Sequence, residues 1–292
     1  MDTWYNLPGE VLIGGIVNGS TYAVMAVGLS LVYGVTRVFN FAYGSFFVFG
    51  AYFAWLFLKL PGFNFGLAIL GALLAMFAVG YLCEWASVRP LRWKPKWDIT
   101  TMMSTLGLAI FLNNVALVSF GPTTRVLPKI AEGNVKLGGF IVTWYEIVVI
   151  IIAIGVIVLL ELFLKKTRMG MSMQAVSQDM TGAKIVGIPI NRVFGYAFAL
   201  SAVLVSISAI LLAPKIFFSP EGGWDTLCKA FVIVAFGGLG SVRGTLFAAF
   251  ILAMVESAVA MYIGMSWVLV VWFMVLLGVL AIRPKGLAGV WS

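Results

Sequence analysis

The sequence predicts an all-α fold: a polytopic transmembrane helical bundle with about eight full spans plus one short or re-entrant segment. Of the 292 residues, 62% are hydrophobic and only 10% are charged, and the mean hydropathy is +1.07. Soluble domains carry roughly 25% charged residues. No polar segment is long enough to form a soluble domain, so we expect residues 1–292 to form a single transmembrane domain.

Eight apolar stretches have the length of full spans, since a helix of about twenty apolar residues crosses a bilayer. They are Val11–Gly34, Phe41–Leu58, Phe65–Cys83, Thr100–Phe120, Tyr145–Leu164, Val193–Ala213, Thr245–Ile263 and Trp267–Ile282. A ninth stretch, Trp224–Phe236, is too short to cross comfortably and runs into the glycine-rich segment Gly237–Gly244. No basic residue precedes the first stretch, so it lacks the positive region of a cleavable signal peptide and should be retained.

The segments between the spans carry turn and loop signals. Pro61-Gly62 indicates a tight turn after the second span. Four basic residues crowd the loop after the third span: Arg89, Arg92, Lys94 and Lys96. Gly121–Trp144 is a longer polar loop. Glu161 lies four residues before Lys165, a spacing typical of a helical ion pair, whereas we interpret Glu84 as a boundary residue at a span end.

The basic residues predict an N-terminus outside and a C-terminus in the cytoplasm. If the short segment reaches the inner face, six of the 19 basic residues are external: Lys59, Arg125, Lys129, Lys136, Lys215 and Lys229. The others, including those of the tail Arg283–Gly289, then lie inside, as the positive-inside rule requires. Tyr43–Tyr52 and Arg243–Leu252 both open a span with Gly-Ser or Gly-Thr in opposite halves, which is consistent with an inverted repeat.

Several kinds of site are excluded by composition. The chain has no histidine, which removes Ser-His catalysis, histidine metal sites and histidine proton relays. Cys83 and Cys228 lie in or beside apolar stretches, and we interpret them as small apolar residues. No P-loop motif is present, so we expect no ATPase site, no catalytic residues and no cofactor. The net charge of +8 suits cytoplasmic loops and anionic lipid, and does not argue for nucleic acid.

Lys165–Arg192 is the longest polar stretch with helical periodicity. Its apolar residues form one stripe of a short helix: Met173, Val176, Met180 and Ala183. Gln178 and Asp179 lie off this stripe. Ser172 is a possible N-cap, and Gly187 followed by a proline signals the end of the helix. An amphipathic helix between two spans fits either a docking element for a partner or a helix lying on lipid head groups.

Uncharged polar side chains lie within or at the mouths of the spans: Asn18, Ser20, Thr21, Asn40, Asn113 and Asn114. They suit a pathway for a polar or zwitterionic solute, but they also fit hydrogen bonds between helices. The break with Gly237, Gly238 and Gly240 fits either backbone that lines a cavity or close helix packing. Glu256 is the only acid within a long apolar stretch. It is therefore a functional candidate, although it could instead pair with a neighbouring subunit or reach an interface.

The spans lack the continuous chain of ionisable groups that a proton- or sodium-driven carrier usually has. A pump energised by a separate ATPase would need a docking helix and no P-loop, and both conditions are met. The alternative is an ATP-independent channel or secondary carrier for a small polar solute such as urea or an amide.

A series of motifs extends over nearly the whole chain. They are Asn18-Gly-Ser-Thr-Tyr-Ala23, Leu31-Val-Tyr-Gly34, Phe39-Asn-Phe-Ala-Tyr-Gly44, Ser104-Thr-Leu-Gly107, Ile110-Phe-Leu-Asn113, Ala175-Val176, Ala183-Lys-Ile-Val-Gly-Ile188, Phe236-Gly-Gly-Leu-Gly-Ser241 and Arg283-Pro-Lys-Gly-Leu-Ala-Gly289. In this order and spacing, the sequence resembles the inner-membrane permease of branched-chain amino acid ABC importers, the LivH type.

The resemblance implies a transport subunit in the bacterial inner membrane, paired with a second, related permease. It also implies two cytoplasmic ATP-binding subunits, which the Lys165–Arg192 loop contacts, and a periplasmic solute-binding protein. Two residues depart from the family pattern. Tyr43, expected in the pathway, stands where the family usually has histidine, which leaves the solute open between branched-chain amino acids and urea, amides or other small acids. Gln174 stands where arginine is frequent, which bears on the ATPase contact.

Overall fold

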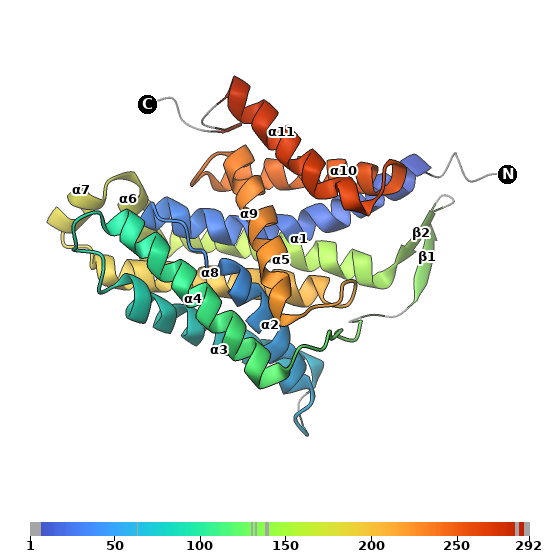
Figure 1. Cartoon of the computed structure of the whole chain (residues 1–292), viewed down its shortest axis with the longest axis horizontal. Helices are drawn as coiled ribbons and strands as arrows, with labels where there is room; N and C mark the ends of the chain where they lie inside the picture. Colours follow the sequence, from blue (N-terminus) through green and yellow to red (C-terminus); the bar gives the residue numbers. More distant parts are fainter. Residues whose placement is uncertain are drawn as a thin grey trace.

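The computed structural model is a bundle of long apolar helices (Figure 1), and it describes residues 7–62, 64–129, 131, 133–137, 140–283 and 286–288. In chain order the helices are α1 (Leu7–Thr36), α2 (Tyr43–Leu58), α3 (Phe65–Cys83), α4 (Trp97–Phe120), α5 (Trp144–Lys166), α6 (Arg168–Gln178), α7 (Met180–Ile185), α8 (Ile190–Leu212), α9 (Gly223–Gly237), α10 (Val242–Tyr262) and α11 (Val268–Ile282). A π-helical turn, Glu84–Val88, extends α3, and 3₁₀ turns precede α9 (Pro220–Gly222) and α11 (Met265–Trp267).

The polytopic helical bundle expected from the sequence is confirmed. Within the described residues, seven helical segments are long and apolar enough to cross a membrane, and α2 is a shorter apolar helix. The 16 residues of α2 span about 24 Å at the rise of an α-helix, which is less than the ~30 Å hydrocarbon core. Most side chains of α2 are buried by other helices. Its length is therefore set by protein neighbours more than by the bilayer.

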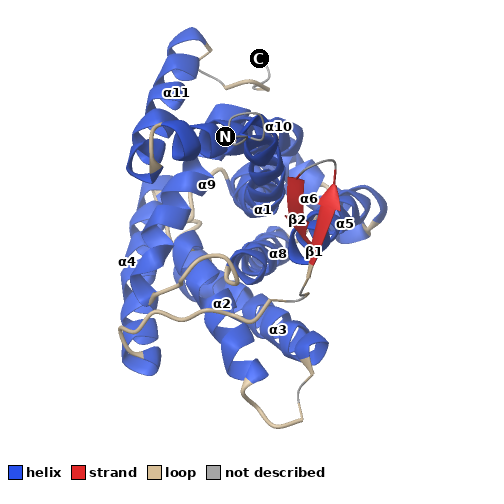
Figure 2. Cartoon of the chain, turned by 90° about the vertical axis from the view of Figure 1, so that its right-hand side faces the viewer, coloured by secondary structure: helices blue, strands red, loops and turns tan. Residues whose placement is uncertain are grey.

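Helix α1 lies at the centre of the bundle. It contacts α5, α8, α9 and α10, and Figure 2 shows these helices around it when the molecule is viewed along α1. In the most apolar part of each span, 67% of residues are buried in α1 and 78% in α8, but only 22% in α5 and 17% in the α11 segment. Helices α1 and α8 therefore form the core, while α5 and α11 present broad apolar faces to lipid or to a partner.

The short helix α9 crosses the direction of α1 (Figure 1), and glycine permits its closest contact with α2. A Cβ atom on Gly44 would lie 2.0 Å from the carbonyl oxygen of Gly223. The two backbones therefore leave no room for a side chain at Gly44. Such small-residue contacts let two helix backbones approach, which strengthens van der Waals packing in lipid. The short segment expected at Trp224–Phe236 is thus an interior helix packed on α2.

The two ends of the bundle differ in character. Helices α6 and α7 lie at one end, and a β-hairpin lies at the other, with the described start of α1 on the hairpin's side (Figure 1). The hairpin pairs β1 (Asn134–Leu137) with β2 (Phe140–Thr143) in antiparallel register, Asn134 opposite Thr143. The Gly121–Trp144 segment was expected to be a polar loop, and the sequence analysis did not predict this hairpin. Of the basic tail, Pro284, Lys285 and Gly289 lie outside the described residues.

Candidate functional site

The loop between α5 and α8 folds as two helices, where the sequence predicted one. Thr167 caps α6, because its hydroxyl accepts a hydrogen bond from the Gly170 amide at 3.0 Å. Ser172, the predicted cap, instead lies inside α6, and its hydroxyl donates to the Arg168 carbonyl. Asp179 has extended backbone angles, and its carboxylate accepts from the Thr181 amide at 2.9 Å. Asp179 therefore ends α6 and caps α7.

The predicted stop at Gly187 is confirmed. Gly187 has φ +83°, the left-handed conformation that glycine adopts without a Cβ penalty. Its amide donates to the Lys184 carbonyl, and the Ile188 amide donates to the Ala183 carbonyl. These two bonds form the Schellman arrangement, which satisfies the last carbonyls of a helix.

The apolar stripe of α6 and α7 faces the chain's own core. Met173, Val176 and Ala183 are buried in one cluster with Leu164 of α5 and Phe194 of α8, and Met180 packs against that cluster. The opposite face is open: Gln178, Asp179 and Gly187 are exposed. At the tip, Ile185 and Val186 are 81% and 76% exposed. A partner at this end would therefore meet the tip and the polar face, because the stripe is already occupied.

Two contacts between side chains and the loop tie it to the rest of the bundle. Arg37, which follows α1 with φ +58°, donates from Nη2 to the Ser177 carbonyl at 2.6 Å. The Ser177 carbonyl belongs to the last turn of α6, where a cation also complements the helix dipole. The Lys184 ammonium lies 4.4 Å from the ring centroid of Trp93, in the loop between α3 and α4. Helices α6 and α7 are thus in direct contact with α1 and with that loop.

A buried cluster anchors the loop between α3 and α4 to the start of α8. The Arg92 guanidinium donates to the Glu84 carboxylate and to the Asn191 side chain, and it lies 4.0 Å from the Phe194 ring centroid. Burial lowers the pKa of Arg92 below its ordinary value, and Glu84 opposes that shift. Arg92 was expected among the basic residues of this loop and Glu84 as a boundary residue at a span end. The structure adds that both are buried, because each satisfies the other's charge.

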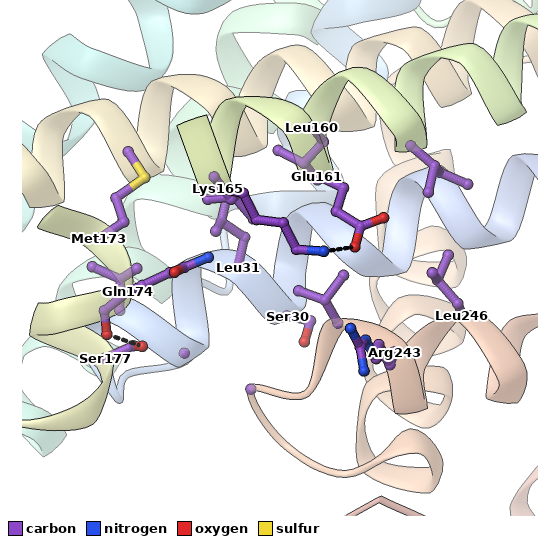
Figure 3. Close-up of a pocket in the computed structure, with 16 residues that line it drawn as sticks. Ser30, Leu31, Leu160, Glu161, Lys165, Met173, Gln174, Ser177, Arg243 and Leu246 are labelled. Atoms are coloured by element: carbon purple, nitrogen blue, oxygen red, sulfur yellow. Dashed lines mark hydrogen bonds and ion pairs between the residues drawn. The ribbon is translucent and has the colours of Figure 1, made fainter. Parts of the chain in front are cut away.

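A groove of about 320 Å³ runs between α1, α5, α6 and α10 (Figure 3). Gly240, one of the expected pathway residues, lines it, as do Met173 and Gln174 of α6. The predicted ion pair between Glu161 and Lys165 lies at its mouth and is confirmed, with 2.5 Å between carboxylate and ammonium. The glycine-rich break and the α5–α8 loop, far apart in sequence, therefore meet in one groove.

The glycine-rich break combines both interpretations left open by the sequence. Gly237 packs against Gly244 and Thr245, where a Cβ atom would lie 2.6 Å from the Thr245 backbone. Gly238 and Gly240 have φ of +101° and +82°, which turn the chain between α9 and α10. Gly237 thus serves close packing, whereas Gly240 borders a cavity.

The polar residues expected in the pathway do not form one continuous surface. Most of them form hydrogen bonds within the chain. The hydroxyls of Ser20 and Thr21 donate to carbonyls of their own helix, and the Tyr43 hydroxyl donates to the Met25 carbonyl. Asn40 Oδ1 accepts from the Ala42 amide, and Asn113 Oδ1 accepts from the Ser45 hydroxyl. Asn18 is half-buried and lines a separate cavity with Glu256. The structure therefore brings Asn18 to Glu256, and it holds the other residues apart from that pair.

Glu256 has a partner that sequence reasoning missed. Lys229 lies in α9 rather than in an outer loop, and its ammonium is 2.9 Å from both Glu256 Oε1 and the Tyr22 hydroxyl. The Tyr22 hydroxyl donates to the same carboxylate oxygen at 3.0 Å. The available signal was a single lysine in an apolar segment and a single acid in the next one. Charges at membrane depth usually pair within the bundle.

The comparisons with known proteins agree with this architecture. A family model described as "Branched-chain amino acid transport system / permease component" matches residues 11–280. The chain belongs to this permease family. It is 29% identical to the high-affinity branched-chain amino acid transport system permease protein BraD of Pseudomonas aeruginosa, over 96% of this chain and 95% of BraD. It is 28% identical to LivH of Escherichia coli, with the same coverage of both chains.

A solved structure titled "PsaBC from Streptococcus pneumoniae in complex with Fab" is also similar to this permease. It has a TM-score of 0.49 and 19% identity, and covers 97% of this chain and 94% of that chain. Membership of the family makes the chain a multi-pass membrane permease component of an ABC transport system.

Proposed function

We propose that this permease moves branched-chain amino acids, or a related small polar solute, into the cytoplasm, driven by ATP hydrolysis on separate subunits. The proposed partners are two cytoplasmic ATP-binding subunits, a periplasmic solute-binding protein and a second, related permease that forms a heterodimer. The names of the relatives support the solute class. The apolar faces of α5 and α11 leave ample surface for a second permease or for lipid.

The observation that carries the proposal is the build of the α5–α8 loop. Its apolar stripe is fixed to α5 and α8, while Ile185 and Val186 project from the end of the bundle. The α5–α8 loop can transmit movement because one side of it packs on α5 and α8 while its tip is exposed. Two adjacent exposed apolar residues at the tip offer a small apolar surface for a contact with another protein.

In this mechanism the ATP-binding subunits contact the tip residues Ile185 and Val186 and the exposed residues near them, Gln178, Asp179 and Gly187. Met173, Val176, Met180 and Ala183 carry the movement into α5 and α8, and Arg37 carries it into α1. Alternating access follows as the spans rock about the interface between the two permeases. The pathway residues Asn18, Ser20, Thr21, Asn40, Tyr43, Asn113, Gly237, Gly238 and Gly240 then lie on or beside the moving helices. Those now bonded within the chain would have to exchange partners to meet the solute.

The proposed orientation places the α6–α7 end in the cytoplasm of a bacterial cell and the hairpin end outside. The basic loop residues support it, since Lys94, Lys96 and Lys184 all belong to segments at the α6–α7 end.

The test is solute uptake by the full complex in proteoliposomes. With ATP inside and the binding protein outside, we expect accumulation of leucine, isoleucine or valine. The chain purified alone should neither bind nor hydrolyse ATP, because it lacks a P-loop. Uptake without ATP would favour the channel or secondary carrier, and hydrolysis by the chain alone would contradict the proposal.

A further inference from the structure

A polar lane follows the contact between α1 and α10. Asn18 and Tyr22 lie four residues apart on α1, a spacing that keeps them on one side of the helix, and Glu10 lies about two turns before Asn18. Glu10 and Asn18 line a cavity of about 380 Å³ together with Glu256 and Ser257 of α10. The lane thus runs from the end of the bundle at Glu10 to the buried ion pair of Glu256.

One carboxylate oxygen beside this cavity has no hydrogen-bond partner in the part of the chain that the structure describes. Glu256 is only 2% exposed, and its Oε1 accepts from both Lys229 and Tyr22. Glu256 Oε2 and the Ser257 hydroxyl are buried and have no hydrogen-bond partner among the described residues. A buried carboxylate oxygen without a donor is costly, so this atom is suited to a ligand that brings one.

The rest of the lining is apolar. Val11, Ala260, Met261 and Met265 complete the cavity. Methionine is flexible and fills irregular space, so such a wall adapts to aliphatic groups of different branching. The volume lies at the lower end of the range of about 300–1,000 Å³ for small-molecule sites.

We propose that this cavity binds zwitterionic aliphatic amino acids in transit. Glu256 Oε2 accepts from the ammonium group, and the methionine wall contacts the side chain. The solute carboxylate lies toward Lys229, which pairs with Glu256 and is itself outside the cavity lining. The assignment rests on the proposed function. It adds the site at which the permease itself binds the charged groups of its solute.

The resident ion pair makes such binding reversible. Removing one member of a buried pair leaves an uncompensated charge, which is strongly unfavourable. A zwitterion supplies both charges at once, so Lys229 and Glu256 each keep an opposite charge beside them while the solute is bound. After the solute leaves, they pair with each other again. A neutral amide offers neither charge and cannot make the exchange.

The experiment is substrate protection of a cysteine in the cavity. Met261→Cys is placed in a Cys228→Ser background, since Cys228 is exposed and Cys83 is buried. The full importer without its binding protein is assembled in nanodiscs and treated with a methanethiosulfonate reagent. We expect millimolar leucine to slow the modification of the introduced cysteine. Isovaleramide, which has the leucine-like side chain but no charges, should leave the rate unchanged.

Further variants separate the ion pair from its surroundings. Glu256→Gln should abolish protection, and so should the double variant Lys229→Met/Glu256→Gln, which leaves no unpaired buried charge and therefore controls for misfolding. Glu161→Gln, a carboxylate outside this cavity that pairs with Lys165, should keep the protection.

Equal protection by isovaleramide, or protection that survives in the folded double variant, would overturn the assignment. So would the absence of protection in an importer shown to accumulate leucine. An importer that accumulates amides and no amino acid would overturn the proposed solute class, and the cavity assignment with it.

Discussion

Arg37, which lies just after α1, connects two parts of this permease that are far apart in the sequence. Arg37 is one of two non-glycine residues with positive φ among those described, and Lys96 is the other. Such a conformation is uncommon outside glycine and persists where surrounding contacts favour it. Two hydrogen bonds hold Arg37 here: its side chain donates to the Ser177 carbonyl and its amide donates to the Tyr33 carbonyl.

Arg37→Gln should therefore weaken the attachment of α6 to α1. The lost charge-assisted hydrogen bond is worth roughly 1 kcal/mol at an exposed position. We expect assembly and basal ATP hydrolysis to persist, while the solute transported per ATP hydrolysed falls, as measured in proteoliposomes. Lys94→Gln, an exposed cation in the loop between α3 and α4, is the matched control and should keep this ratio. An unchanged ratio in both variants would show that the Arg37 contact carries no coupling.

At the scale of elements, part of the α5–α8 loop could be predicted from the sequence. The stripe of Met173, Val176 and Ala183 was identified correctly as apolar and periodic, and it is buried. Its break at Asp179 was missed, because an aspartate off the apolar stripe reads equally well as a surface residue or as a cap. The surface that covers an apolar stripe depends on tertiary packing, so it cannot be predicted from periodicity alone.

A pair of substitutions separates the two faces of this loop. Val176→Asp buries a carboxylate in the core, so it should lower stability by several kcal/mol, seen as a lower melting temperature of the purified complex. Val186→Asp at the exposed tip should leave that temperature unchanged and abolish solute-stimulated ATP hydrolysis. If instead the tip variant retains full stimulation, the tip is not the contact with the ATP-binding subunits.

For the whole molecule, the sequence predicted the helices better than the contacts between them. The third span was placed at the residues of α3, Phe65–Cys83, because apolar length and flanking turns define a span locally. The partnership of Lys229 with Glu256 was not predicted, since it depends on how α9 crosses α10. The same holds for Glu84 and Arg92, which become a buried pair only when α8 covers them.

The proposed orientation predicts opposite labelling of the two ends. Single cysteines at Lys94 and Ser177 should react with an impermeant reagent only from the cytoplasm, and one at Lys129 only from outside. Membrane vesicles of right-side-out and inside-out orientation provide the measurement. Labelling of Lys94 and Lys129 from the same side would require a different number of crossings between them.

The central place of α1 also has a consequence for synthesis. This helix precedes the other described helices in the chain, so it leaves the ribosome before them, whereas α10, which covers its polar lane, is the second-to-last described helix. At bacterial elongation rates the delay is roughly 10–45 seconds. During that time Ser20 and Thr21 remain satisfied, because their hydroxyls donate to carbonyls of α1 itself. Asn18 and Tyr22 have no such local partner, so an insertase or chaperone that shields nascent spans would bind near the middle of this helix.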